Sequence, residues 1–359
     1  MRSDKITNGS GTALAALAVM TNGYSVMLGS NAGRDVWISH LVAGIAALIC
    51  TWFLVSLCEK YPKKTFYEVL ESVLGKFFGK LCSALLALLS LVTCVISLTV
   101  FSRFVQITAL PQTPQIIIPM LIIIIAALSL RRGLRAASGS ARLLFWFSAT
   151  VFVIFVVFGT KWMDFSLLLP IGESPGEIFK GAVEVFLNRF GTIPALMAVY
   201  TRMQPEKARK RFLLSSVGGA SAALVLISAV TAATLGAETA KADFYPIYTA
   251  MSVRGIGGFI QHTEILACIA MTLSLFFKSA VCLLFSDDML TGIFNTARRE
   301  GAAMPLALMC AAATQIIYRD ISTLRGLVEW KSGATSVAAF YILFPAVLVL
   351  ISRLRRKIQ

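Results

Sequence analysis

A stretch at residues 184–198 combines a membrane-like composition with side chains that could bind a small charged molecule. Its candidate binding residues are Asn188, Arg189, Phe190, Gly191 and Thr192, and a Pro follows two residues later. A guanidinium within an apolar span is expensive, so it either pairs with a carboxylate or serves function. The Gly and the Pro indicate an interrupted helix. Interrupted backbone within a bilayer survives only where protein or a water-filled cavity satisfies its N–H and C=O groups, so we expect residues 188–194 to line a cavity.

A second interruption lies near the N-terminus, within the apolar residues 12–32. Its candidate binding residues are Thr21, Asn22, Gly23 and Tyr24. Two interrupted spans in corresponding halves of a chain indicate a transporter-type binding site near the bilayer midplane. Their free helix-end N–H and C=O groups match the carboxylate and ammonium of an amino acid. We therefore expect a pocket between residues 21–25 and 188–192, although Gly23 has the alternative role of a close-packing residue between helices.

Three other charged residues lie in or near the predicted spans. Glu184 lies about 140° round an ideal helix from Arg189, so the partner of Arg189 is expected on another helix or on a ligand. Glu264 either titrates a proton or binds a ligand amine, or else it pairs with an outer residue such as Arg254. Lys278 follows Glu264 by about 21 Å of helix, too far to pair, and is expected to extend toward the cytoplasmic face.

Enzyme chemistry has no support in the sequence. No nucleophile with an adjacent base, no phosphate-cradling glycine motif and no cofactor fingerprint is visible. With two His residues no metal-ligand cluster is visible either. The seven Cys residues form no C-x-x-C pair and are expected to be packing residues within the spans. We expect no catalysis, no cofactor and no metal.

The composition indicates a membrane protein with many spans. Hydrophobic residues make up 57% of the 359 residues and charged residues 14%, against about 25% charged in soluble domains. The net charge of +15 lies between apolar spans and not on a soluble module, which argues against a nucleic-acid partner. The lipid bilayer is the expected surrounding.

The apolar segments predict an all-α integral membrane protein with ten transmembrane helices. The expected spans are residues 12–32 (broken), 36–57, 81–106, 115–130, 139–159, 176–199 (broken), 212–235, 260–285, 302–318 and 333–351. Ten spans with the first and sixth broken indicate two inverted five-helix repeats within a single polytopic domain, residues 1–359. Repeat one covers about 12–159 and repeat two about 176–351.

Basic residues and capping signals add three local expectations. Roughly two thirds of the Lys and Arg residues fall on one side, which places both termini in the cytoplasm. Thr65 is expected to cap an amphipathic helix at residues 65–80, lying at the cytoplasmic membrane surface. Asp35 is expected to cap the second span. Hydroxyls of the third span are expected to bond to other helices.

Several landmarks recur together in one known family. They are Asp35-Val-Trp-Ile-Ser39, Tyr61-Pro62 with Thr65 and Glu68, Leu74-Gly75-Lys76, Leu168-Leu-Pro170, and His262-Thr-Glu264 with Phe277-Lys278. In this order the chain resembles the spore germination permease family, the B-type membrane subunits of germinant receptors, in the amino acid–polyamine–organocation transporter superfamily. Two features depart from the family pattern: residues 26–33 contain no Pro, and His262 stands where Arg is more usual.

The resemblance implies a leucine-transporter-like fold and a role in spore germination. The first hypothesis is a receptor subunit in the spore inner membrane that binds a small germinant such as an amino acid, with A-type and C-type subunits as partners. The second is a proton-coupled amino-acid permease of the cell membrane. The third is a scaffold whose pocket is vestigial.

Overall fold

The computed structural model describes residues 5–21, 28–159, 163–243, 245–252, 263–296, 301–317 and 334–358, almost all of them helical. The α-helices are α1 (Asn8–Met20), α2 (Val36–Glu59), α3 (Phe66–Leu74), α4 (Lys76–Thr108), α5 (Ile117–Arg131), α6 (Leu134–Gly159), α7 (Pro175–Val185), α8 (Ile193–Tyr200), α9 (Arg209–Leu235), α10 (Ala237–Ala242), α11 (Pro246–Ser252), α12 (Thr263–Phe294), α13 (Ala303–Ile317) and α15 (Ala334–Ile358). Shorter elements are the strands β1 (Ile6–Thr7) and β2 (Met203–Gln204), the 3-10 turns η1 (Ser30–Asp35), η3 (Phe165–Leu168) and η5 (Glu206–Ala208), and the π-helical turn η4 (Phe186–Phe190).

The predicted spans coincide with helices. Within the described residues, seven helical segments are long and apolar enough to cross a membrane, with α7, η4 and α8 together forming one of them. The apolar helices α5 and α13 have 15 residues each, and α1 has 13. The all-α membrane architecture is confirmed. Ten crossings and the two repeats at 12–159 and 176–351 stay predictions.

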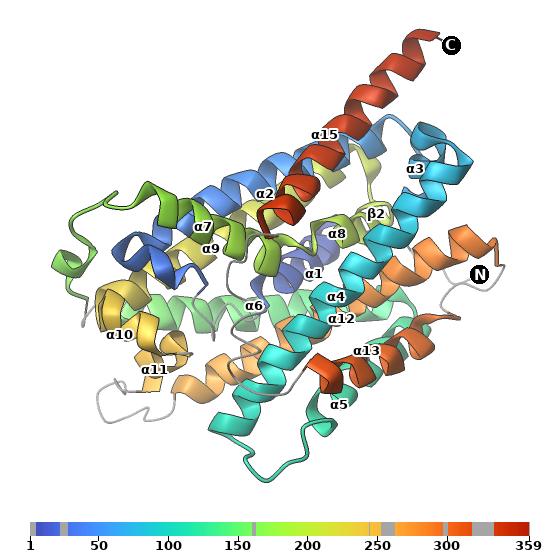
Figure 1. Cartoon of the computed structure of the whole chain (residues 1–359). Coiled ribbons are helices and arrows are strands. Elements are labelled where there is room, and N and C mark those ends of the chain that lie inside the picture. Colours follow the sequence, from blue (N-terminus) through green and yellow to red (C-terminus); the bar gives the residue numbers. More distant parts are fainter. Residues whose placement is uncertain are drawn as a thin grey trace.

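Helix α12 runs through the middle of the bundle (Figure 1), where it contacts α1, α4, α5 and α8. Helix α1 is buried along almost its whole length between α6, α9 and α12. By contrast, α6 and α15 expose most of their apolar side chains, as expected for helices that face lipid. The residues next to the two predicted interruptions therefore lie deep in protein.

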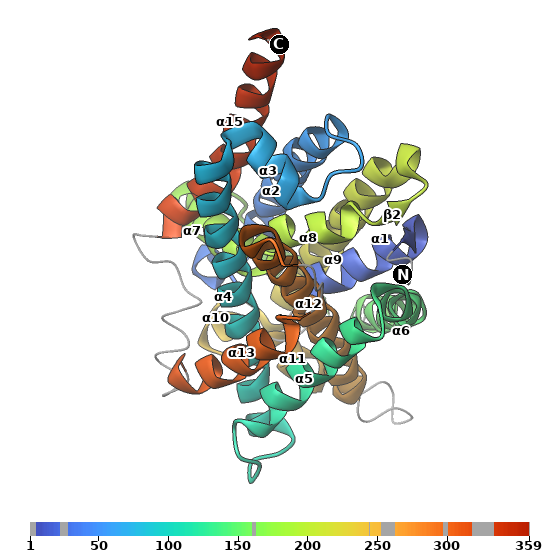
Figure 2. The same cartoon turned by 90° about the vertical axis from the view of Figure 1, so that its right-hand side faces the viewer.

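The beginning of α1 is fixed to the chain that follows α8. Strands β1 and β2 pair in parallel, with Ile6 opposite Met203 and Thr7 opposite Gln204. The Thr7 hydroxyl caps α1 by accepting from the Ser10 amide. Figure 2 shows α1, α8 and β2 side by side near the N-terminus. The two half-helices that adjoin the interruptions are thus joined at their far ends.

Helix α3 is amphipathic as predicted, but its apolar face packs on protein. Thr65 and Glu68 form a capping box at its N-terminus, and Gly75, with φ 85°, ends it before α4 begins. Val69, Leu70 and Val73 are fully buried in the main core. The expectation of one helix over 65–80 is therefore wrong, since Gly75 divides it, while its position at the membrane surface stays a prediction. The same stripe that suits a membrane surface also suits a groove between helices.

Asp35 precedes α2 but makes no capping hydrogen bond there. Its buried carboxylate instead accepts from the Gly172 amide at 3.0 Å and the Glu173 amide at 3.2 Å. The expected cap is corrected to a contact across 137 residues. A carboxylate that receives several amide N–H groups is a strong anchor, so this contact ties the loop before α7 to the start of α2.

Docking of α3 depends on a glycine in α12. A Cβ on Gly292 would lie 2.3 Å from the Tyr67 ring, whereas a Cβ on Gly219 of α9 meets nothing within 4 Å. We expect Gly292→Ala to lower the free energy of unfolding in detergent by about 1–3 kcal/mol through overpacking. The matched control Gly219→Ala should be neutral or slightly stabilising. Equal thermal stability of the two variants would show that α3 does not pack on α12 in this way.

Candidate functional site

The interruption in the sixth span is a wide turn. Helix α7 passes into the π turn η4, and Gly191 and Thr192 then connect to α8. Both residues keep right-handed backbone angles, φ −56° and −82°, so the expectation of unwound chain is corrected to a local widening of the helix. A Cβ on Gly191 would lie 2.4 Å from the Leu187 carbonyl oxygen. The turn therefore needs glycine at this position.

Arg189 joins the two interruptions. Its Nη1 donates to the Thr21 carbonyl oxygen at 2.8 Å, and the side chain is 2% exposed. Thr21 ends α1 with an extended backbone, and carbonyls at a helix C-terminus carry partial negative charge. The guanidinium is thus well matched to this carbonyl. The structure thus brings Thr21 and Arg189 into direct contact.

Lys278 lies in the same region, contrary to the sequence-based expectation. Its side chain is 1% exposed, and its Nζ donates to the Asn188 carbonyl oxygen at 3.3 Å. The expected extension toward the cytoplasmic face is therefore wrong. A widened helical turn leaves carbonyls that need donors, and this contact is the physical reason for the inward direction of the ammonium.

A second residue of α12, Ser274, also contacts the site. The Thr21 hydroxyl shares its single hydrogen between the Ala18 carbonyl oxygen of its own helix at 3.0 Å and the Ser274 carbonyl oxygen at 3.1 Å. Ser274 lies one helical turn before Lys278, on the same face of α12. Sequence analysis missed this residue. Because the contact uses the backbone carbonyl of Ser274, the residue type at this position gave no signal for it.

Most other residues in and next to the π turn are buried, and Asn188 is half-buried. Phe190 is 1% exposed and packs on Phe186, whose ring also faces Tyr341. Asn188 donates its side-chain amide to the Glu184 carbonyl oxygen at 2.9 Å. Thr192 is fully buried, and its hydroxyl has no hydrogen-bond partner within the described residues. A buried polar atom of this kind usually has a partner, which marks Thr192 as a ligand-facing candidate.

Glu184 holds the chain that follows the first interruption. Its carboxylate accepts from the Gly29 amide at 3.0 Å, and Glu184 is 4% exposed. Gly29 has φ 74° and approaches Gly181 so closely that a Cβ on Gly29 would lie 3.1 Å from the Gly181 Cα. Both sides of the first interruption, Thr21 and Gly29, are therefore attached to the sixth span.

The structure does not place the remaining predicted site residues at the π turn. Asn22, Gly23 and Tyr24 lie outside the described residues, and the pocket wall that they were expected to form stays a prediction. Glu264 lies in the first turn of α12, and its side chain is likewise outside the described part. Since α12 is continuous, its Cα lies about 21 Å along the axis from that of Lys278. The structure therefore does not bring Glu264 to the π turn.

Hydroxyls of the third span bond first within their own helix. Thr93, Ser97 and Thr99 each donate to the carbonyl four residues earlier in α4, and Thr93 also bonds to the Tyr341 side chain of α15, as expected for a helix interface. The charged groups at the site are two cations, Arg189 and Lys278. Each donates a hydrogen bond to a backbone carbonyl at one of the two interruptions. Among the described residues no group of His, Cys, Asp or Glu is arranged to hold a metal ion.

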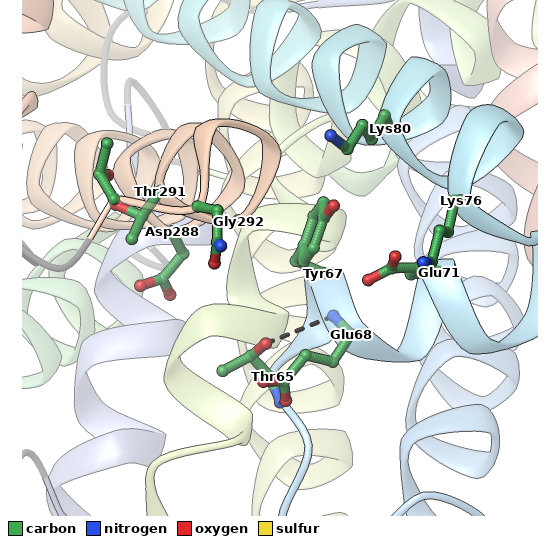
Figure 3. A pocket seen from close by; sticks show the side chains of 11 residues that line it. Thr65, Tyr67, Glu68, Glu71, Lys76, Lys80, Asp288, Thr291 and Gly292 are labelled. Carbon is green, nitrogen blue, oxygen red and sulfur yellow. Dashed lines mark hydrogen bonds between the residues drawn. The ribbon is translucent and has the colours of Figure 1, made fainter.

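A separate polar cavity of about 550 Å³ lies between α3, the first turns of α4 and the end of α12 (Figure 3). Two of its carboxylates already have partners: Glu68 belongs to the capping box, and Asp288 accepts both Nη atoms of Arg202 at 2.6 and 2.7 Å. Burial, with a smaller contribution from Glu71, raises the pKa of the Tyr67 hydroxyl. Tyr67 therefore stays a neutral phenol at neutral pH, as a packed side chain requires.

The helical bundle has the leucine-transporter fold of integral membrane proteins. The chain superposes on MhsT in complex with L-phenylalanine with a TM-score of 0.62, covering 95% of this chain and 87% of MhsT at 14% identity. A manganese transporter of Eremococcus coleocola gives a TM-score of 0.63, covering 96% and 78% at 11% identity. At these identities the likeness shows the fold alone.

Residues 5–322 match the model of the family described as spore germination protein, and the chain belongs to that family. Spore germination protein KB of Bacillus subtilis is 22% identical over 342 residues, 92% of this chain and 89% of that protein. Spore germination protein XB of Bacillus anthracis is 25% identical over 297 residues, 79% of each chain.

The inward position of Lys278 can be measured without a mutation. We expect a membrane-impermeant amine-acylating reagent to modify the exposed Lys80 of α4 at least about tenfold faster than Lys278, because a buried amine reacts only after local opening. Peptide mass spectrometry of the native protein reads both sites. Comparable rates at the two lysines would show that Lys278 reaches the membrane surface.

Proposed function

We propose that the chain is a germinant-binding membrane subunit of a spore germinant receptor. Its ligand is a small carboxylate-bearing germinant such as an amino acid, bound between residues 21–25 and 188–192. The observation that carries the proposal is the pair of cations, Arg189 and Lys278, held at the two interruptions. Their positive charge attracts an anionic head group in a low-dielectric interior.

The hydrogen bonds of the Thr21 and Asn188 carbonyls change which ligand group we expect the site to bind. Sequence analysis assigned free carbonyls to a ligand ammonium, yet the Thr21 and Asn188 carbonyls already accept from Arg189 and Lys278. A ligand carboxylate is therefore favoured as the principal polar contact. The unpartnered Thr192 hydroxyl is a candidate second donor, and the buried ring of Phe190 a candidate apolar wall.

Family membership and fold support this proposal from two directions. The relatives are named spore germination proteins, and MhsT, which shares the fold, was solved with L-phenylalanine. By resemblance we further propose A-type and C-type receptor subunits as partners. The proposed location is the spore inner membrane, with both termini in the cytoplasm.

A proton-coupled amino-acid permease is the second candidate. The observation in its favour is that the match to a transporter fold covers nearly the whole chain. Reconstituted protein distinguishes the two. Uptake of labelled amino acid against a gradient, abolished by an uncoupler, would favour the permease. Saturable binding without uptake would favour the receptor subunit.

The test begins with a thermal-shift screen of amino acids and sugars on purified protein, since a ligand of the folded state raises its stability. With the ligand found, we expect Thr192→Val to raise its half-saturating concentration roughly three- to tenfold, as for one lost hydrogen bond. Thr231→Val is the matched control, because Thr231 is equally buried but bonds to the Ile227 carbonyl within α9.

Two outcomes would contradict the proposal. If no compound shifts the thermal stability, the pocket is vestigial and the scaffold hypothesis holds. If Thr192→Val keeps the parental half-saturating concentration in spores and in vitro, the ligand lies away from the π turn.

A further inference from the structure

A cavity of about 530 Å³ lies at the turn between α5 and α6, apart from the site described above. Helix α5 ends at Arg131 and α6 begins at Leu134. Between them Gly133 has φ 97° and its amide donates to the Leu130 carbonyl oxygen at 2.8 Å. Such a glycine ends the helix abruptly. The turn therefore holds Arg131 and Arg132 beside the first turns of α6.

The lining divides into a basic rim and an apolar wall. Arg131 and Arg132 supply the rim, and the wall consists of Ile125, Leu128, Ala136 and Ala137. Two serines complete the lining, but their hydroxyls donate to carbonyls of their own helices at 2.7 and 2.8 Å. Recognition of a ligand therefore falls to the guanidinium groups.

The apolar wall continues along the outside of α5. Leu121, Ile125 and Leu128 are exposed at 57, 54 and 43%. Their spacing of four and three residues places them on one face of the helix, and the next positions of that face are Arg131 and Arg132. An exposed apolar track thus leads along a membrane helix directly to two guanidinium groups.

The stretch of sequence that contains this turn carries only positive charges. No Asp or Glu occurs between Glu71 and Asp164, whereas Arg131, Arg132, Arg135 and Arg142 all lie in that interval. None of the four salt bridges found in the described residues uses Arg131 or Arg135. The natural counterion at a membrane surface is an anionic lipid.

We propose that this cavity binds an anionic phospholipid, with its phosphate on Arg131 and Arg132 and an acyl chain along Leu121, Ile125 and Leu128. A planar guanidinium binds a phosphate through two parallel hydrogen bonds. The positive N-terminal end of the 26-residue helix α6 adds to the attraction for the phosphate. A soluble anion would use the rim but not the apolar track.

The test compares three probes on the full chain in detergent: phosphatidylglycerol, phosphatidylcholine and inorganic phosphate. Native mass spectrometry and thermal shift report binding. We expect phosphatidylglycerol to bind several-fold more tightly than phosphatidylcholine. The double variant Arg131→Gln with Arg132→Gln should weaken phosphatidylglycerol binding roughly tenfold, and its phosphatidylcholine binding should not change.

Two further variants keep the outcome unambiguous. Arg353→Gln, which removes an exposed arginine at the far end of α15, should leave the lipid preference intact. Arg131→Lys with Arg132→Lys keeps the charge but loses the paired guanidinium bonds, so its preference for phosphatidylglycerol should lie between those of the parent and of the double Gln variant. It also serves as the second variant where the double Gln variant does not fold, and a preference equal to that of the parent would then contradict a bidentate phosphate site.

The proposal is overturned by any of three results. The first is equal affinity of the parent for both lipids, and the second is an unchanged preference in the double Gln variant. The third is stabilisation by inorganic phosphate equal to that by phosphatidylglycerol, which would mean a site for free anions.

Discussion

Backbone groups that a helix leaves without partners inside a membrane must find them within the protein, and this constraint organises the centre of the molecule. The interruptions of the first and sixth spans leave carbonyls at Thr21 and Asn188, and Arg189 and Lys278 donate to them. The burial of α1, the central course of α12 and the close approach of Gly29 to Gly181 all serve to bring those two cations to those two carbonyls.

Sequence reasoning located the helices and the sixth interruption because apolar length, glycine and proline act locally. The Thr65 capping box was likewise visible in four residues. Sequence reasoning failed where a partner far away in the chain decides the direction of a side chain. The sequence around Lys278 is apolar and does not show whether the ammonium points inward or outward. Its inward direction depends on the Asn188 carbonyl, 90 residues away. Asp35 shows the same limit, since its amide partners come from a loop 137 residues away. A stripe such as that of α3 cannot reveal whether lipid or protein covers it.

The two basic features of the chain have different physical settings. Arg189 and Lys278 are fully buried and hold backbone carbonyls, so their charge acts in a medium of low dielectric constant over short distances. The arginines at the α5–α6 turn are exposed and act at the membrane surface, where salt weakens them. The net charge of the chain does not distinguish these two groups of cations. Their proposed roles, attraction of a ligand and binding of a lipid, follow from where each cation lies relative to helix ends and to lipid.

The short parallel pairing of β1 with β2 couples the half-helices α1 and α8 mechanically. Because Asn8 also donates to the Pro205 carbonyl at 3.0 Å, tilting α1 alone would break backbone and side-chain bonds together. Arg202, just after α8, in turn forms an ion pair with Asp288 of α12. The two half-helices are therefore bonded to each other, and the end of α8 is bonded to α12. A displacement at one interruption is therefore opposed by bonds that also hold the other, through the two-residue pairing of β1 with β2.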